Sequence, residues 1–417
     1  MNHYFLIFLL LLLGVINANS QKVSKKQEPK GAYYTGEYRN LFKEIGKSQQ
    51  EIDARVEQIY TQLFYGNDST QRVYYPVGDD MAYIKDTYFQ DVRTEGMSYG
   101  MMVAVQLNKK KEFNALWKYA KTYMQNKTGY RKGYFAWSGN FNTHTVNDMN
   151  SAPDGEEYFV TALFFASHRW GDSTGIFNYK AEANQLLHDM VHLETRNGGI
   201  QDGLSNMFNH TEKKVVFVTQ GPHNTFTDPS YHLPAFYKLW AVWADKDNDF
   251  WTAVADTSKA YLPRAVHPVS GLVTEYMSFA GKPQATDFNA NSDKFCGDSW
   301  RVAMNLGVDV HWWGNEVWQE TLLSRWINFF NSQGKDYKTV YNWDGSPVSF
   351  TWGHSVGCVA MNATGILGTN NEKSADYVQE LWDSNLPEGV HRYYNGLLYM
   401  LGYLNCSGKY KIWMPEK

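Results

Sequence analysis

The chain has 417 residues, of which 43% are hydrophobic and 20% are charged, and its formal net charge is −4. This composition supplies enough apolar side chains for a large buried core, and the near-neutral charge argues against a nucleic acid as partner. The unusual feature is an aromatic content of 16%. Part of that surplus must pack in the core. We expect the rest to line a groove, because flat rings stack well on the apolar face of a sugar.

The N-terminus has the pattern of a secretory signal. Residues 5–15 form a continuous apolar run, and Ala18-Asn19-Ser20 provides a small-residue cleavage site. The run is too short to span a bilayer, and polar sequence follows it directly. No cysteine lies near the cleavage point, so we expect no lipid anchor. We therefore predict a signal peptide at 1–20, export to the periplasm or the medium, no membrane anchor, and one mature domain at 21–417.

From about residue 50 onward, helical periodicity recurs between polar or Gly-rich breaks. Strand signals are weak and local, at 214–219 and 271–276. Many segments are apolar nearly all round, as expected for helices inside a larger assembly. We predict an all-α fold with about twelve helices in a double ring, the (α/α)6 barrel. The expected helices are 50–64, 95–108, 111–126, 155–170, 176–190, 230–244, 247–263, 298–312, 315–332, 353–367, 373–384 and 390–405.

Three long stretches separate some of these helices, at 127–154, 191–229 and 264–297, and they are rich in Gly, Asn, Asp and aromatic residues. Loops of this length in a compact domain are usually functional. We expect them to gather on one face of the barrel and form a substrate cleft.

Three predicted helix starts each present an acid: Glu95 in RTEGMSYGMM, Asp154 in SAPDGEEYF and Asp298 in CGDSWR. Inverting hydrolysis of a glycosidic bond needs one protonated acid and one ionised carboxylate that activates water. Apolar surroundings would raise the pKa of Glu95 and suit it to the acid role, whereas Arg93 would oppose that shift. The alternative is that all three acids simply stabilise helix N-termini. Arg301, three residues after Asp298, would favour an ionised Asp298.

Aromatic residues near these acids are candidates for substrate binding. Tyr134 and Trp137 precede Asp154 in GYFAWS, and Trp137 is expected to be a stacking platform beside the cleavage point. Tyr231 and Tyr276 lie in the long loops or at their ends. Core packing is an equal alternative for each of them. The phenol of Tyr231 is the best placed to hold the catalytic water or to orient the base.

Metal and cofactor signals are weak. The twelve histidines show no metal-ligand spacing, and the three cysteines supply none either. We therefore predict no metal ion and no cofactor, and we expect buried thiols rather than a disulfide framework.

The segment 152–170 resembles the signature of glycoside hydrolase family 8. The positions in register are Ala152, Asp154, Gly155, Ala162, Leu163, Ala166 and Trp170, and the departures are Pro153, Glu156, Phe159, Val160 and Phe164. The segment around Glu95 is similar to the acid-bearing motif of the same family, and the resemblance spans about residues 35–410. It implies an (α/α)6 barrel, an inverting mechanism and no required cofactor.

Carried over by residue, the resemblance makes Glu95 the general acid and Asp154 the carboxylate that binds and distorts the sugar. Asp298 resembles the general base of the xylan-active subgroup, whereas other subgroups take the base from elsewhere. The implied substrate is a xylan-derived oligosaccharide, with glucan and chitosan as alternatives within the family. We expect a monomer.

The xylan-active subgroup contains endo-xylanases and enzymes that release xylose from the reducing end. In the latter, a loop with a histidine closes the cleft beyond the reducing-end sugar. His354 occupies the comparable region here, but Ser355 and Val356 replace the expected bulky neighbours. We favour the reducing-end activity; the alternative for His354 is a histidine at a helix start that bonds a backbone carbonyl. A polysaccharide lyase or a non-catalytic sugar-binding protein fits three retained acids less well.

Overall fold

The computed structural model describes residues 30–416, so the predicted signal peptide at 1–20 lies outside the described residues. Within this part of the chain there are fourteen α-helices, and the twelve predicted helices are confirmed as α3 to α14. The helices are α1 (Ala32–Thr35), α2 (Leu41–Glu44), α3 (Gln49–Tyr65), α4 (Thr94–Gln106), α5 (Lys110–Tyr119), α6 (Pro153–Trp170), α7 (Tyr179–Val191), α8 (Pro234–Trp243), α9 (Asn248–Ala265), α10 (Arg301–Trp313), α11 (Val317–Gln333), α12 (Val356–Gly365), α13 (Ser374–Asp383) and α14 (Arg392–Cys406).

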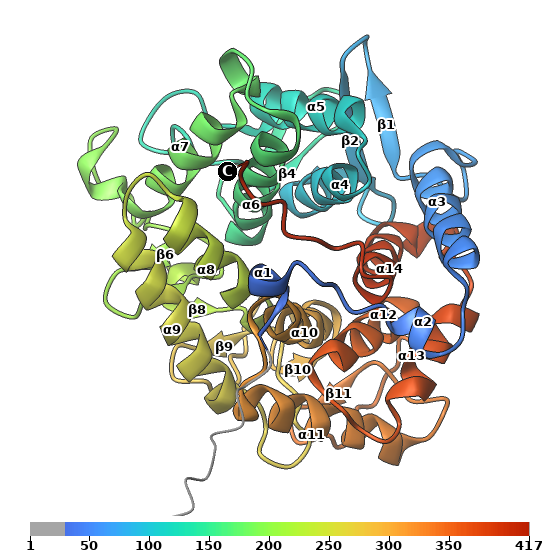
Figure 1. The fold of residues 1–417 in the computed structure, drawn as a ribbon. Coiled ribbons are helices and arrows are strands. Elements are labelled where there is room, and N and C mark those ends of the chain that lie inside the picture. Colours follow the sequence, from blue (N-terminus) through green and yellow to red (C-terminus); the bar gives the residue numbers. More distant parts are fainter. Residues whose placement is uncertain (1–29, 417) are drawn as a thin grey trace, which may run out of the picture.

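Six of these helices contact one another in a closed cycle. The order is α4, α6, α8, α10, α12 and α14, and α14 contacts α4 again. Each has an outer companion, in the pairs α4–α5, α6–α7, α8–α9, α10–α11, α12–α13 and α14–α3. Figure 1 shows the cycle of inner helices with their companions around it.

The difference between inner and outer helices follows from their sequences. The first fourteen residues of α6 are all buried, including its acids. The outer helix α3 is instead amphipathic, with buried residues on one face and exposed polar residues on the other. It begins at a capping box, in which Ser48 Oγ accepts from Glu51 N and Glu51 Oε2 accepts from Ser48 N.

Glycines allow inner helices to approach closely at two contacts. A Cβ on Gly155 of α6 would lie 2.4 Å from Thr94 Cβ of α4. A Cβ on Gly307 of α10 would lie 2.4 Å from the main-chain oxygen of Thr364 in α12. Both gaps are shorter than any ordinary van der Waals contact, so these positions require glycine.

The all-α prediction missed a small antiparallel sheet of five strands, in the order β1 (Tyr74–Val77), β2 (Met81–Asp86), β3 (Asp91–Arg93), β4 (Ser138–Gly139) and β5 (Val146–Asp148). Three further strand pairs are β6–β7 (Phe208–Asn209, Lys214–Val215), β8–β9 (Phe226–Thr227, Met277–Ser278) and β10–β11 (Lys294–Phe295, Tyr341–Asn342). Of the strand predicted at 214–219 only β7 forms, and the segment 271–276 forms no strand. Strands this short show too few alternating positions to be recognised.

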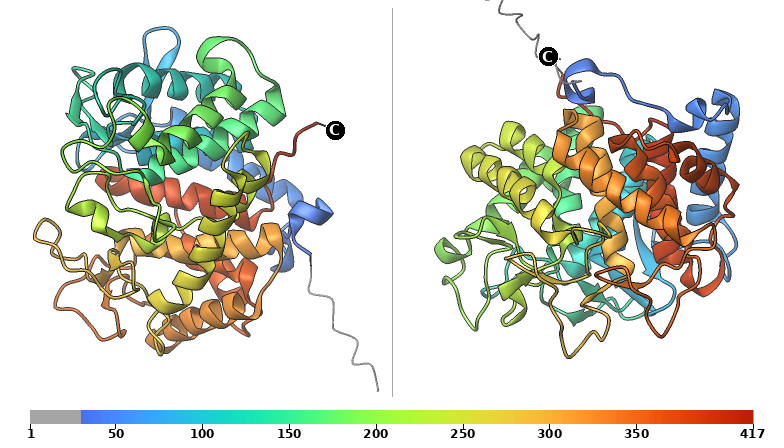
Figure 2. Two further views of the ribbon diagram at one scale, coloured as in Figure 1. Left: turned by 90° about the vertical axis from the view of Figure 1, so that its left-hand side faces the viewer. Right: turned by 90° about the horizontal axis from the view of Figure 1, so that it is seen from below.

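The long loops collect on one face of the molecule, and α1 and the C-terminal end lie on the opposite face (Figure 2). The strand β3 leads directly into α4, and the loops at 127–152 and 266–296 lead into α6 and α10. The N-termini of these three inner helices therefore open towards the loop face. Among the described residues, no helix has the length and apolarity needed to cross a bilayer.

Candidate active site

Three helix N-termini bring Glu95, Asp154 and Asp298 onto one guanidinium, that of Arg301 on α10. Arg301 Nη1 lies 2.9 Å from Glu95 Oε2 and 3.1 Å from Asp154 Oδ2. Its Nη2 lies 3.0 Å from Asp298 Oδ1. The structure thus places together four residues that come from positions up to 206 apart in the chain.

One guanidinium contacts an oxygen of each acid, so the three carboxyls form a single cluster. Glycoside hydrolysis requires a pair of carboxyls that flank the scissile bond. The side chains of Glu95, Asp154 and Asp298 remain 14%, 7% and 29% exposed, respectively. A ligand that approaches from the loop face can therefore reach them.

Glu95 has the electrostatics of a proton donor. Its pKa is raised to about 8, mainly by burial and in addition by the charges of Asp154 and Asp298, against the opposing effect of Arg301. The hydroxyl of Tyr393 donates to Glu95 Oε1 at 3.0 Å. At neutral pH the carboxyl is therefore mainly protonated.

Arg93 opposes this shift only weakly, because its side chain is occupied elsewhere. Arg93 Nε lies 3.0 Å from Asp91 Oδ1 and 3.5 Å from Asp86 Oδ2. Arg301 is the larger of the two cationic influences on the pKa of Glu95. The sequence therefore predicted that Arg93 lowers the pKa of Glu95, but not that this lowering is small.

Asp154 and Asp298 differ in their surroundings. The pKa of Asp154 is raised to about 6, mainly by burial and against the opposing effect of Arg301. Gly155 N donates to Asp154 Oδ1 at 2.9 Å. The more exposed Asp298 accepts a hydrogen bond at Oδ1 from the Tyr394 hydroxyl at 3.2 Å. A carboxylate with solvent contact, a neighbouring cation and a hydroxyl donor is positioned to bind a water molecule.

Two further buried carboxyls surround Asp298, and the sequence analysis did not single them out. Glu275 Oε1 lies 3.4 Å from the main-chain nitrogen of Asp298, and burial together with the Asp298 charge raises the pKa of Glu275 to about 8. Asp228 Oδ2 lies 3.9 Å from Arg301 Nη2, and burial raises its pKa well above the usual value. The Thr227-Asp228-Pro229-Ser230 segment is a turn signal at the edge of a long loop, and that was the only available cue.

The predicted aromatic residues lie in different environments. Tyr231 is 4% exposed, and the Arg301 guanidinium carbon lies 5.7 Å from its ring centroid. Tyr276 is buried against loop aromatics, and its hydroxyl accepts from Asn289 Nδ2 at 3.3 Å. Tyr134 is 1% exposed and donates to the main-chain oxygen of Ser205, so the structure assigns it core packing. Its contact with substrate stays a prediction, as do those of Tyr231 and Tyr276.

Trp137 is half-buried beside the start of α4. Its main-chain oxygen accepts from Thr94 N at 3.0 Å, and the Arg93 guanidinium carbon lies 5.3 Å from its ring centroid. The ring therefore lies beside Arg93, two residues before Glu95, and its role as a stacking platform stays a prediction.

His354 hydrogen bonds to the protein through both ring nitrogens. Nδ1 lies 2.9 Å from the main-chain oxygen of Tyr337, and Nε2 lies 2.6 Å from Glu380 Oε1. The hydrogen bond to Glu380 is the main reason that the pKa of His354 is raised. These bonds match the alternative given for His354 in the sequence analysis, namely a histidine near a helix start that bonds a backbone carbonyl. Its contact with a reducing-end sugar stays a prediction.

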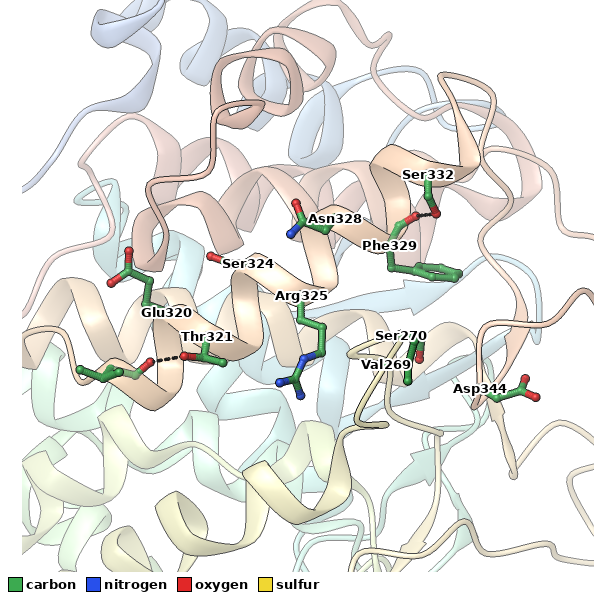
Figure 3. Close-up of a pocket in the computed structure, with 11 residues that line it drawn as sticks. Val269, Ser270, Glu320, Thr321, Ser324, Arg325, Asn328, Phe329, Ser332 and Asp344 are labelled. Carbon is green, nitrogen blue, oxygen red and sulfur yellow. Dashed lines mark hydrogen bonds between the residues drawn. The ribbon is translucent and has the colours of Figure 1, made fainter.

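Other parts of the described chain add no rival catalytic site. A surface cavity of about 660 Å³ lies away from the carboxylates, between α11 and the turn at Val269 and Ser270 (Figure 3). Among residues 30–416, no three His, Cys, Asp or Glu side chains are grouped so that they would hold a metal ion. The three cysteines, Cys296, Cys358 and Cys406, are buried and unpaired.

Comparison with known proteins gives consistent matches. The pattern of Glycosyl hydrolases family 8 matches residues 83–408. The reducing-end xylose-releasing exo-oligoxylanase Rex8A of Paenibacillus barcinonensis is 42% identical over 92% of this chain and 99% of its own length. A protein of the same description from Halalkalibacterium halodurans is 43% identical over 94% and 98%.

A solved structure agrees with these relatives. The xylohexaose complex of a catalytic mutant of a GH8 xylanase from Teredinibacter turnerae has a TM-score of 0.88 at 41% identity, covering 92% of this chain and 100% of that chain. By contrast, Endoglucanase 2 of Ruminiclostridium josui is 26% identical over 77% of this chain and 64% of its own length.

Proposed function

Because the chain belongs to glycoside hydrolase family 8, we propose that it is an inverting hydrolase of β-1,4-linked xylo-oligosaccharides that releases xylose from the reducing end. The observation that carries this proposal is the binding of Glu95, Asp154 and Asp298 to the single guanidinium of Arg301. The high identity to two reducing-end xylose-releasing enzymes supports the substrate and the exo action. The much lower identity to an endoglucanase makes glucan a weaker alternative.

The proposed mechanism is a single displacement. Glu95, protonated at neutral pH, donates its proton to the leaving glycosidic oxygen as the bond from that oxygen to the anomeric carbon breaks. Asp298 takes a proton from a water molecule, whose oxygen forms the new bond to the anomeric carbon from the opposite face. Asp154 holds the sugar at the cleavage point. After the turnover Glu95 is ionised and Asp298 is protonated, and proton exchange with solvent restores both.

Arg301 and burial shift the pKa of Glu95 in opposite directions. The charge of Arg301 favours the ionised state of the carboxyls around it, yet burial keeps the pKa of Glu95 above neutrality. The more exposed Asp298 also receives the Tyr394 hydroxyl bond, which helps to orient its carboxyl group. The raised pKa of Glu95 supports its assignment as the acid.

The fold proposed for this activity is an (α/α)6 barrel with the substrate cleft on its loop face. The closed cycle of six helices, each with an outer companion, supports it. This cycle joins helices from residue 94 to residue 406, which supports one catalytic domain within 21–417. A signal peptide at 1–20, export to the periplasm or the medium, and a monomeric state complete the proposal.

Endo-xylanase activity is the second candidate, and two observations favour it. His354 is held by Tyr337 and Glu380, so its ring nitrogens are already bonded within the protein. The similarity to a xylanase solved with xylohexaose is also close to that of the exo-acting relatives.

A timed digest of xylohexaose with a label at the reducing end tests the choice. Early release of labelled single xylose, with xylopentaose as its partner product, is expected. Labelled fragments of several lengths at the first time points would instead establish endo cleavage and leave His354 as a structural residue. Cleavage of cello-oligosaccharides in place of xylohexaose would overturn the xylan assignment.

A further inference from the structure

An exposed tryptophan lies in the same loop as His354. Trp352 is 45% exposed, although tryptophan is usually well covered. The loop around it is hydrogen bonded on both sides of the residue. Ser355 Oγ donates to the main-chain oxygen of Trp352 at 3.3 Å, and Thr339 Oγ1 donates to that of Gly353 at 3.1 Å. The ring is therefore presented from an anchored backbone.

The Trp352 ring lies next to the residue that precedes Asp298. A Cβ built on Gly297 would lie 3.7 Å from Trp352 Cζ3 and 2.4 Å from Glu275 Oε1. Gly297 also has a φ of +42°, a conformation that favours glycine. Glu275 excludes a side chain at Gly297, and the Trp352 ring lies within ordinary van der Waals distance of this position beside the proposed base.

Two further aromatic rings connect Trp352 to the base carboxylate. The Tyr394 hydroxyl bonds to Asp298 Oδ1 at 3.2 Å, and the Tyr394 and Trp300 ring centroids are 6.1 Å apart. Trp300 is buried, and its centroid is 6.1 Å from that of Trp352 at an interplanar angle of 76°. The aromatic rings of Tyr394 and Trp300 therefore lead from Asp298 to the exposed ring of Trp352. Such an edge-to-face arrangement fixes the orientation of that ring.

We propose that Trp352 is a sugar-stacking residue of the catalytic site, on the side of the carboxylate cluster opposite Trp137. The proposal rests on the function given above and deepens it by naming a second aromatic subsite. Trp137 lies at the start of α4 beside β4, whereas the Trp352 loop follows β11 and contacts the segment that leads into α10. These two groups of elements lie on opposite sides of the helix cycle (Figure 1).

The chemistry of the occupant follows from the exposed ring. A flat indole with an anchored backbone fits the apolar face of a pyranose, and a xylose ring has no hydroxymethyl group to hinder the approach. An oligosaccharide bound across Arg301 would then have one aromatic contact on each side of the cluster. In this arrangement Trp352 contacts sugar from the same loop that carries His354.

The test is the affinity for xylohexaose, measured by titration calorimetry in a Glu95→Gln background so that the ligand is not cleaved. Trp352→Ala is compared with Trp352→Phe, which keeps a flat ring. The matched control is Tyr34→Ala, because Tyr34 is 59% exposed on α1 at the opposite face of the molecule. We expect Trp352→Ala to raise the Kd about ten-fold, the size typical of an aromatic contact residue, with most of the affinity retained in Trp352→Phe. Tyr34→Ala leaves the Kd unchanged.

Three results would overturn the proposal. The first is an unchanged Kd in Trp352→Ala. The second is an equal loss of affinity in Trp352→Phe and Trp352→Ala together with a lowered Tm, which would make the ring a packing element for Trp300. The third is an equal effect of the Tyr34 control. Binding of cellohexaose in place of xylohexaose by the parent Glu95→Gln protein would refute the proposed function alone. The ten-fold comparison is then made with cellohexaose and decides the Trp352 proposal separately.

Discussion

Replacing Glu95 by glutamine removes the proton donor while it keeps the size of the side chain. The Glu95 pKa of about 8 means that about 99% of the carboxyl is protonated at pH 6. Nearly every wild-type molecule can therefore supply the proton at that pH. Loss of a positioned general acid costs a factor of roughly 10²–10⁴, which corresponds to about 3–5 kcal/mol in the activation free energy.

The expected loss depends on the leaving group, and this dependence identifies the acid. On xylotriose, the kcat of Glu95→Gln should fall by the full factor. On xylobiosyl fluoride it should fall far less, because fluoride departs without a proton from the enzyme. Initial rates on the two substrates at pH 6 provide the assay. An equal fall on both would refute the reasoning, since it would show that Glu95 acts through folding or binding.

The same pKa sets the alkaline limit of the wild-type enzyme. The catalytically active form is protonated, so kcat/KM on xylotriose should fall as the pH rises through about 8. Activity on xylobiosyl fluoride should extend to higher pH than activity on xylotriose. If activity on both substrates fell over the same alkaline pH range, the fall would have to come from the titration of a group other than Glu95.

Three further substitutions test the surroundings of the site. Glu156 is fully buried, and burial raises its pKa to about 8, so between pH 4.5 and 8 the folded state keeps a proton that the unfolded state releases. Its contribution to stability therefore falls by about 1.4 kcal/mol per pH unit in that window, and Glu156→Gln should gain in Tm relative to wild type between pH 5 and pH 7.5; a difference that is the same at both pH values would contradict this. Gly155→Ala should lower Tm and kcat together, because its Cβ would lie 2.4 Å from Thr94 Cβ; a wild-type Tm in a thermal melt would disprove the close contact. Arg301→Gln should destabilise the fold by about 3–5 kcal/mol at pH 7.5, since it leaves buried carboxyls without a countercharge. Urea titrations should show a smaller loss at pH 5, where more carboxyls are protonated; an equal or larger loss there would count against the role of Arg301.

Much of the helical framework was predictable because apolar side chains recur with the helical period. The acids were predictable for a related reason: each follows a loop and opens an apolar helix. Arg301 could be linked to Asp298 because they lie three residues apart near the same helix start. The convergence of Glu95 and Asp154 on the same guanidinium depends on how three helices meet, and local sequence does not encode that distance.

The features that the sequence missed share a physical cause. Tyr394 lies 96 residues from Asp298, and Glu275 lies 23 residues away in a segment without a strand or helix. Neither has a periodic pattern that would place it near the base. For Tyr134 the sequence left core packing and substrate binding as equal alternatives, because a tyrosine with a bonded hydroxyl is as well accommodated in a core as in a groove. Exposure separates Trp352 from the buried aromatic residues, and only the folded chain provides it.

The most direct test of the central claim is the configuration of the first product. Proton NMR during the first minutes of xylotriose hydrolysis reports the anomer formed at the new reducing end of xylobiose. We expect the α-anomer to appear first and then to mutarotate, because water attacks from the face opposite the leaving group. Initial formation of the β-anomer would contradict the single-displacement roles of Glu95 and Asp298.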